Sequence, residues 1–114
     1  SAAGRAPEAL RHFTEAVILR PEDVGARGAL GDALIEADRP AEALTHYETA
    51  LRLQPGQNAA LHTSTGNALI RLGRMAEAIR HYEDALRLNP DDREARANLA
   101  TVRAAAQRRG LLKK

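Results

Sequence analysis

Apolar residues recur along the chain at the three- and four-residue spacing that places them on one face of a helix. The first such segment runs from Pro7 to Leu19. The same spacing predicts five further helices, at about 24–37, 40–53, 59–72, 75–88 and 93–109. Prolines and glycines separate these segments, as expected between helices. The pattern therefore predicts an all-α chain of about six helices.

The predicted helix ends have ordinary chemical signals. Pro7 suits the first turn of a helix, where its missing N–H is not needed. Gly4-Arg5 aligns with Asp38-Arg39 and Gly73-Arg74, which lie between two predicted helices, so it is expected to form a turn as well. Gly73 is expected to end the fourth helix. The short polar side chains that precede three other helices are expected to cap them; these are Asp23, Asn58 and Asp92.

Two segments of the chain are nearly identical. Arg39–Pro55 returns at Arg74–Pro90 with 12 of 17 positions unchanged, and a weaker copy lies at Arg5–Pro21. The spacings between copies are 34 and 35 residues. A period of this size is typical of a helical repeat array, in which each unit packs on its neighbour.

The residues conserved between the copies resemble the tetratricopeptide repeat (TPR) family. The matching positions in the two full units are Leu30-Gly31, Leu34, Ala43, Tyr47, Ala50 and Pro55, then Gly66, Leu69, Ala78, Tyr82, Ala85 and Pro90. The resemblance implies a right-handed superhelical stack of antiparallel helix pairs. The family's large aromatic residue early in the first helix of each pair is absent; Arg27, His62 and Arg96 stand there.

The resemblance implies one domain over residues 1–114. It comprises a half repeat at 4–22, full repeats at 23–56 and 57–91, a capping helix at 92–109 and a basic tail at 110–114. The first copy lacks a preceding helix, so we expect either a boundary inside a longer array or a partner from another chain.

In the TPR family, the first helix of each pair lines a concave groove that holds peptide ligands. Carried over position by position, this implies a partner-binding set of small and polar side chains: Asp32, Glu36, Thr63, Ser64, Asn67, Arg71, Asn98 and Thr101. The poor helix formers from Thr63 to Asn67 also indicate either function or close packing. The alternative is that Thr65 and Gly66 merely permit close packing, with hydroxyls bonded back to their own helix.

One subtype of the family binds the acidic C-terminal tails of heat-shock chaperones through a clamp of Lys, Asn, Asn, Lys and Arg. The corresponding residues here are Gly28, Asp32, Ser64, Glu94 and Asn98. None matches, and Asp32 and Glu94 would repel a carboxylate. The sequence therefore disfavours chaperone-tail binding.

Histidines stand at the same place in each motif copy, at His12, His46 and His81, four residues after Glu8, Glu42 and Glu77. Because another helix separates these copies, the histidines are too far apart to share a metal, and we expect exposed Glu–His pairs instead. The chain lacks cysteine and any glycine-rich phosphate loop. We expect no catalytic residues, no metal and no cofactor.

Composition narrows the partners further. Hydrophobic residues make up 44% of the chain but aromatic residues only 3%, so alanine and leucine must form the core. Residues 93–114 carry seven basic groups and one acidic group, without aromatic partners for nucleotide bases, which disfavours nucleic acid. No apolar run reaches the length of a membrane span. The compartment is not determined.

Together these features predict a non-catalytic protein–protein interaction scaffold that presents a concave groove to a peptide or protein. Two alternatives stay open. In the first alternative, the chain is an accessory TPR region of a larger enzyme, such as a membrane glycosyltransferase. In the second, it is a self-assembly module that forms oligomers through its incomplete N-terminal edge.

Overall fold

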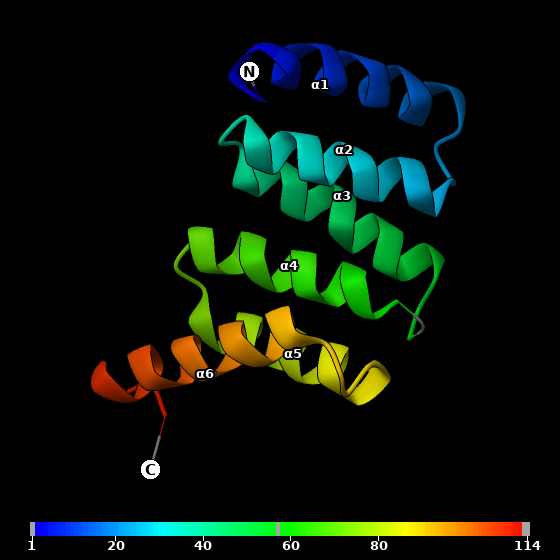
Figure 1. Cartoon of the computed structure of the whole chain (residues 1–114). Coiled ribbons are helices and arrows are strands. Elements are labelled where there is room, and N and C mark those ends of the chain that lie inside the picture. The colour runs from blue at the N-terminus through cyan, green and yellow to red at the C-terminus, as the bar shows by residue number, and fades with distance from the viewer. Residues whose placement is uncertain (1, 57, 113–114) are drawn as a thin grey trace. The chain divides into compact units, whose positions relative to one another are not determined.

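The computed structural model describes residues 2–56 and 58–112, and the described residues contain six α-helices and no strand. Figure 1 shows the helices in order along the chain. Their bounds are α1 Ala2–Leu19, α2 Val24–Glu36, α3 Pro40–Leu53, α4 Ala59–Arg71, α5 Met75–Leu88 and α6 Arg93–Arg108. The predicted all-α helical-repeat class is confirmed.

The three predicted N-caps are formed. Asp23, Asn58 and Asp92 each accept a hydrogen bond from a backbone N–H three residues further on, at 3.1, 3.0 and 3.0 Å. Each bond satisfies one of the N–H groups that a helix start leaves without a partner inside the helix. The starts of α2, α4 and α6 are therefore fixed by local chemistry.

The start of α1 differs from the prediction. The helix begins at Ala2 and contains Pro7, so the expected turn at Gly4-Arg5 is wrong. Proline removes one hydrogen bond to the carbonyl four residues earlier, which disrupts a helix interior but affects few residues near a helix start. Alanines at positions 2, 3 and 6 favour helix in the residues before Pro7.

Left-handed residues end α2 and α4. Gly73 has φ 75° and Asp38, its equivalent 35 residues earlier, has φ 60°. The next backbone N–H then turns back to the helix, from Arg39 to the Leu34 carbonyl at 2.8 Å and from Arg74 to the Leu69 carbonyl at 2.9 Å. This is the Schellman arrangement, which satisfies carbonyls at a helix end.

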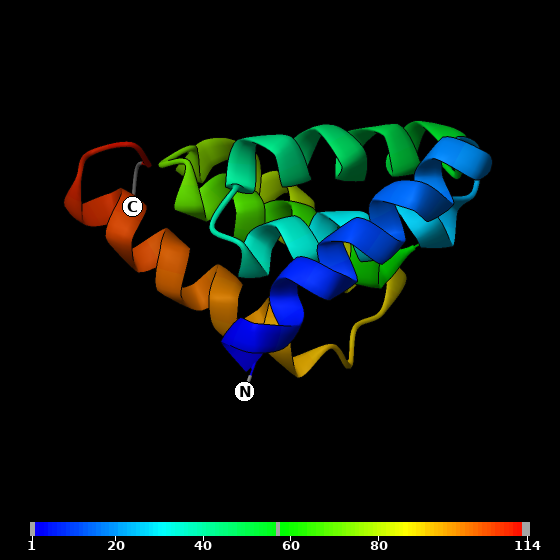
Figure 2. The ribbon, with the colours of Figure 1, turned by 90° about the horizontal axis from the view of Figure 1, so that it is seen from above.

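The chain divides into two compact units, Ser1–Pro55 and Gly56–Lys114. In the first unit α2 packs against both α1 and α3; in the second α5 packs against both α4 and α6, and α4 also touches α6. Within each unit, successive helices run in opposite directions (Figure 1). The view from above shows α1 inclined to α3 rather than parallel to it (Figure 2).

Each unit contains a helix pair joined by the same close contact. A methyl group added at Gly66 would lie 2.6 Å from the Tyr82 ring, and one at Gly31 would lie closer still to Tyr47. Both tyrosine rings are buried, and four alanines of the motif helices are fully buried beside them: Ala43, Ala50, Ala78 and Ala85. The helices can approach this closely because the glycines have no side chain.

Candidate functional site

A polar network joins the three helices of the second unit. The Tyr82 hydroxyl on α5 donates to the side-chain oxygen of Asn67 on α4 at 2.5 Å. The same oxygen accepts from Asn98 on α6 at 2.9 Å, and the Asn67 amide nitrogen donates to Glu94 on α6 at 3.0 Å. Asn67 therefore uses both ends of its amide to tie α5 and α6 to α4.

Tyr82 is the buried anchor of this network. Burial raises the pKa of its phenol to about 12, and the nearby Glu94 carboxylate acts in the same direction, although the hydrogen bond from Asn98 opposes the shift. The phenol is therefore neutral at physiological pH and keeps the proton that it donates to Asn67. The buried Tyr82 hydroxyl therefore holds the partly exposed amide of Asn67 in place, and Asn67 in turn holds the partly exposed amide of Asn98.

The other predicted groove residues of the second unit vary in exposure. Thr63 is buried, and its single hydroxyl proton has two acceptors at 3.2 Å from the oxygen, the Ala59 carbonyl and the Asp92 carboxylate. Ser64 is half-buried, whereas Arg71 and Thr101 are exposed. The structure therefore brings Asn67 and Asn98 into direct contact, and it uses Thr63 to tie α4 to the start of α6.

The remaining two groove residues lie in the first unit. Asp32 and Glu36 are both exposed on α2. Asp32 accepts a hydrogen bond from the Tyr47 hydroxyl at 2.5 Å, which is the same contact that Tyr82 makes with Asn67. A groove formed jointly by these residues and those of the second unit stays a prediction.

The polar stretch of α4 combines the two interpretations that its sequence allowed. Thr65 is fully buried and donates to the Leu61 carbonyl of its own helix at 2.7 Å, and Gly66 faces the Tyr82 ring. These two residues serve packing, while the next residue, Asn67, forms the interhelical network. Sequence reasoning missed Tyr82 and Glu94 as members of this network.

In the motif helices of the two full repeats, the glutamates of the expected Glu–His pairs bind arginines directly, and Glu42 and Glu77 act on His46 and His81 through their charge. Glu77 is bound by both ends of the Arg74 guanidinium, at 2.9 and 2.7 Å, which lowers the pKa of this exposed carboxyl. Arg39 binds Glu42 through one guanidinium nitrogen, at 2.5 Å. In both helices the glutamate pairs with the arginine three residues earlier, because a planar guanidinium matches the geometry of a carboxylate.

The motif histidines of the two full repeats, His46 and His81, contact the helix that precedes their own. His46 Nδ1 lies 3.1 Å from the Arg27 guanidinium, and His81 Nδ1 lies 3.0 Å from His62 Nδ1. Burial lowers the pKa of all three imidazoles, with Arg27 adding to the effect at His46 and His62 adding to it at His81. In the second unit, Asp84 joins the two histidines in one cluster.

Sequence reasoning missed this cluster because it compared only the histidines of the motif copies. His62 belongs to the other helix of the pair and lies 19 residues before His81. The same separation links Arg27 to His46. A search for residues 19 apart, which face each other across a helix pair of this period, would have found both contacts.

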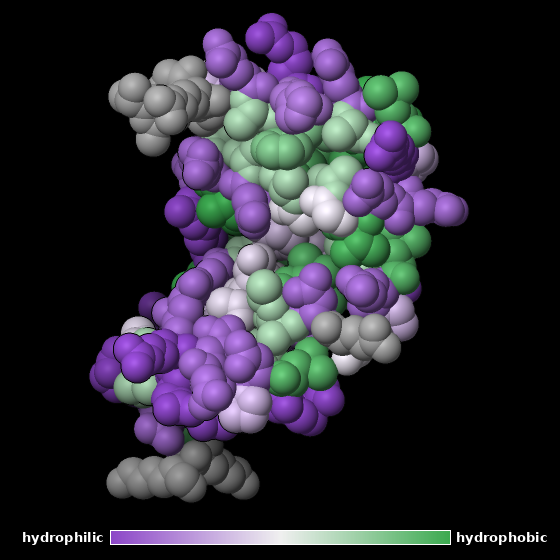
Figure 3. Space-filling model, turned by 45° about the vertical axis from the view of Figure 1, so that its right-hand side comes forward, coloured by the Kyte–Doolittle hydropathy of each residue, from purple (hydrophilic) through white to green (hydrophobic). Residues whose placement is uncertain are grey.

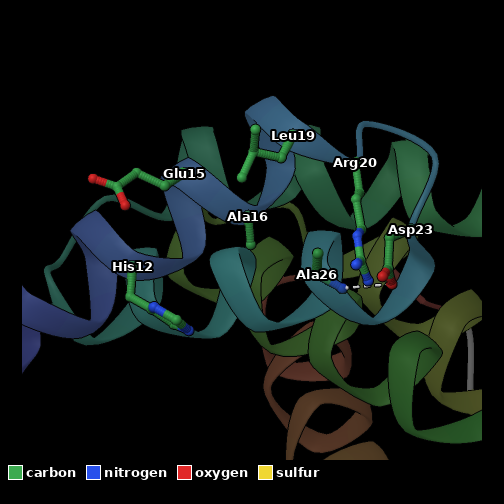
Figure 4. Close-up of a pocket in the computed structure, with 7 residues that line it drawn as sticks. All are labelled: His12, Glu15, Ala16, Leu19, Arg20, Asp23 and Ala26. Atoms are coloured by element: carbon green, nitrogen blue, oxygen red, sulfur yellow. Dashed lines mark hydrogen bonds between the residues drawn. The ribbon is translucent and has the colours of Figure 1, made fainter.

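A hollow of about 290 Å³ lies between α1 and the start of α2 (Figure 4). His12, Glu15, Leu19 and Arg20 line it from α1, and the Glu15 carboxylate points away from the other side chains. Asp23 is used as a helix cap there. The lining therefore brings together no arrangement of nucleophile and base, or of acid and base.

Apolar side chains also reach the surface of the first unit, among charged neighbours (Figure 3). At the end of α1, Ile18 is 72% exposed and Leu19 is 80% exposed. None of the described helices is both long enough and apolar enough to cross a membrane. An adjacent pair of exposed large apolar residues on a helix end is a feature of contact surfaces.

The fold and the glycine–tyrosine contacts define a helical-repeat protein of a class that serves protein interaction. Tetratricopeptide repeat profiles match residues 1–68 and 59–102. The first match alone covers more than half of the chain, so the chain belongs to the tetratricopeptide repeat family. No curated protein sequence matches it significantly.

Solved structures with this fold include TPR domains seen with peptides. The first TPR of Spaghetti (RPAP3) bound to the HSP90 peptide SRMEEVD is 23% identical, with a TM-score of 0.87 over 92% of this chain and 82% of that one. The second TPR domain of human RPAP3 in complex with the HSP70 peptide SGPTIEEVD is 20% identical, with a TM-score of 0.81 over 89% and 83%. The Arabidopsis OM64 TPR domain is 22% identical, with a TM-score of 0.84 over 90% and 84%. At these identities the similarity shows the fold alone.

Proposed function

We propose that the chain is a non-catalytic interaction module that binds an extended peptide across α4 and α6 of its second unit. The observation that carries this proposal is the network in which Tyr82 holds Asn67 and Asn98 in contact. Partly exposed amides fixed by a buried anchor lose little conformational freedom when a ligand binds. They are therefore well suited to recognise a peptide backbone.

The hydrogen-bonding groups near this network fit a backbone ligand. Within the described residues, the side-chain oxygen of Asn98 makes no hydrogen bond, and Thr101 one turn further on is exposed. Ser64 lies one turn before Asn67 on α4. Together these residues offer both donors and acceptors, as a peptide bond requires.

Two of the similar structures carry peptides that end in EEVD, but the ligand proposed here is different. Glu94 accepts a hydrogen bond from Asn67 and lies within the proposed surface. A carboxylate there would repel the terminal carboxylate of such a peptide. We therefore propose an internal, extended segment as the ligand rather than an acidic C-terminal tail.

The test is a selection from a random peptide library, followed by affinity measurement by fluorescence anisotropy. Ser64→Arg and Thr101→Arg place a long side chain on the proposed surface without removing any of the hydrogen bonds described for the network. Each is expected to weaken binding of the selected peptides by about 10-fold or more, because disrupting the centre of an interface costs about 2 kcal/mol and a factor of ten corresponds to about 1.4 kcal/mol. Asn98→Ala is expected to weaken them by a smaller factor.

Glu48→Arg is the matched control, because Glu48 is exposed on α3 of the first unit. This variant introduces the same side chain on the other unit. Equal affinity of wild type, Ser64→Arg and Thr101→Arg would contradict the proposal. Circular dichroism of each variant would show whether its helices are intact.

A second proposal rests on the exposed end of α1, where Ile18 and Leu19 are surrounded by solvent. We infer self-association of two chains through this helix. Sedimentation should then show a mass that rises with protein concentration in the wild type, and Ile18→Glu with Leu19→Glu should abolish the rise. A constant monomer mass at high concentration would contradict it. The peptide proposal does not depend on the outcome.

A further inference from the structure

We propose that His62, His81 and Asp84 bind one divalent transition-metal ion, with zinc as the representative. His62 lies on α4, whereas His81 and Asp84 lie on α5. One potential ligand atom from each residue falls within 4.8 Å of the other two. Two imidazoles with one carboxylate form a ligand set that zinc and its neighbours accept, leaving a fourth position for water or a ligand.

The two imidazole nitrogens require only a small adjustment, whereas the Asp84 carboxylate, within 4.8 Å of them, must turn toward the ion. The two Nδ1 atoms lie 3.0 Å apart and the ring centroids 5.3 Å apart. Two nitrogens bound to a tetrahedral zinc at the usual bond length lie about 3.3 Å from each other. Opening the pair by a few tenths of an ångström would therefore exchange the contact between the rings for two metal bonds.

The surroundings keep the imidazoles in the form that binds metals. Burial lowers the pKa of both His62 and His81, so both rings are neutral at physiological pH and carry a lone pair. His62 is only 8% exposed, whereas the Asp84 side chain is 42% exposed. The ion would reach the cluster from the Asp84 side.

Cations beside the cluster oppose binding and sharpen the test. Arg87 binds Asp84 at 3.1 Å, and this ion pair must loosen when the carboxylate turns to a metal. Arg80 also lowers the pKa of His81, whereas Glu77 raises it. Arg87→Gln should therefore raise the affinity for zinc, because it removes both a positive charge and a competitor for Asp84.

The first unit offers an internal control. The residues 35 positions earlier are Arg27, His46 and Thr49, so only one of the three ligand types is present there. Arg27 approaches His46 where His62 approaches His81. Because the chain itself carries arginine at this place, His62→Arg is expected to fold while it lacks the metal site.

The experiment is a titration of tag-free, metal-free full chain with Zn²⁺ by calorimetry, supported by Co²⁺ titration followed by visible absorption. We expect one Zn²⁺ per chain and a Co²⁺ spectrum of low coordination number. His62→Arg, His81→Gln and Asp84→Asn should each weaken binding by more than the about 10- to 100-fold that loss of an outer-shell partner produces. His12→Gln and His46→Gln should leave the affinity unchanged.

Three results would overturn the proposal. One is the absence of saturable Zn²⁺ binding up to about 1 mM. Another is binding that survives unchanged in the three ligand variants, and the third is binding that Arg87→Gln weakens. These variants do not alter Asn67 or Asn98, so the peptide-binding test and the metal test can fail separately.

A transplant adds a positive test. Arg27→His with Thr49→Asp places the same three residue types around His46 in the first unit. In a His62→Arg background, this double substitution should restore one Zn²⁺ per chain. Failure of the transplant to bind while the wild type binds would contradict the assignment of these three residues as a sufficient ligand set.

Discussion

The α2–α3 pair and the α4–α5 pair share one scaffold, yet they differ in what the tyrosine hydroxyl holds. In both pairs a tyrosine packs on a glycine and donates a hydrogen bond to the residue that follows this glycine. That residue is Asp32 in the first pair and Asn67 in the second. A carboxylate can only accept, whereas an amide also donates. Asn67 therefore extends the contact to Glu94 and Asn98, and a local bond becomes a network across three helices.

The same comparison explains the histidines. Arg27 and His62 occupy equivalent places, and each contacts the histidine of the following helix. The arginine supplies a fixed positive charge that disfavours a cation, whereas the second histidine supplies another neutral ligand. The two units thus repeat the residues that pack and differ in the polar residues to which we assign binding.

The largest effect is expected from substitutions that disrupt the glycine–tyrosine contact shared by the two units. Gly66→Ala forces a methyl group against the buried Tyr82 ring and is expected to cost about 2–3 kcal/mol in the free energy of unfolding. Gly31→Ala should cost at least as much, because its methyl group would lie closer to Tyr47. Urea unfolding measures both. Gly25→Ala, at an exposed helix position, is the control, and a loss below about 0.5 kcal/mol for Gly66→Ala would contradict the scaffold.

The next effect concerns the pH dependence that Tyr82 gives to the stability of the second unit. The pKa of Tyr82 in the folded chain, about 12, lies above the ordinary value near 10. The stabilisation is therefore fully present below pH 10 and is lost as the pH rises from about 10 to 12, by about 2–3 kcal/mol. Urea unfolding at pH 9 and at pH 11.5 measures the loss. Tyr82→Phe should lack this component, and an equal loss in that variant would contradict it.

A smaller effect is expected from substitutions that exchange the polar residues of the two units. Asn67→Asp removes the donor to Glu94 and places two carboxylates side by side, at an expected cost of about 1 kcal/mol. Salt should reduce the cost, and Glu94→Gln should relieve it in the double variant. The reverse substitution, Asp32→Asn, is expected to change the unfolding free energy by less than about 0.5 kcal/mol. Equal costs for the two substitutions would remove the distinction between the units.

The smallest effect concerns the helix ends. Asp38 and Gly73 both have positive φ, which costs an L residue more than glycine. Asp38→Gly should raise the free energy of unfolding, and with it the melting temperature, by about 0.5–1 kcal/mol in free energy, and Gly73→Asp should lower both by a similar amount. Thermal unfolding followed by circular dichroism checks both. Shifts of the same sign would show that contacts of the side chains, rather than φ, decide these positions.

Local signals in the sequence were sufficient for most of the fold. The helical spacing of apolar residues predicted all six helices, and Asp23, Asn58 and Asp92 were predicted and found as caps. These features depend on residues within one or two turns of each other. The start of α1 was mispredicted because Pro7 is a local signal that neighbouring alanines outweigh.

The sequence by itself determined the repeat, the helix pairs and the glycine–tyrosine scaffold, because identical residues at a fixed period impose the same packing each time. It did not determine which polar groups meet. Asn67 meets Asn98 across 31 residues, and His62 meets His81 across 19. Such contacts depend on the rotation and separation of neighbouring helices, and only the tertiary structure decides these to the few tenths of an ångström that a hydrogen bond or a metal ligand requires.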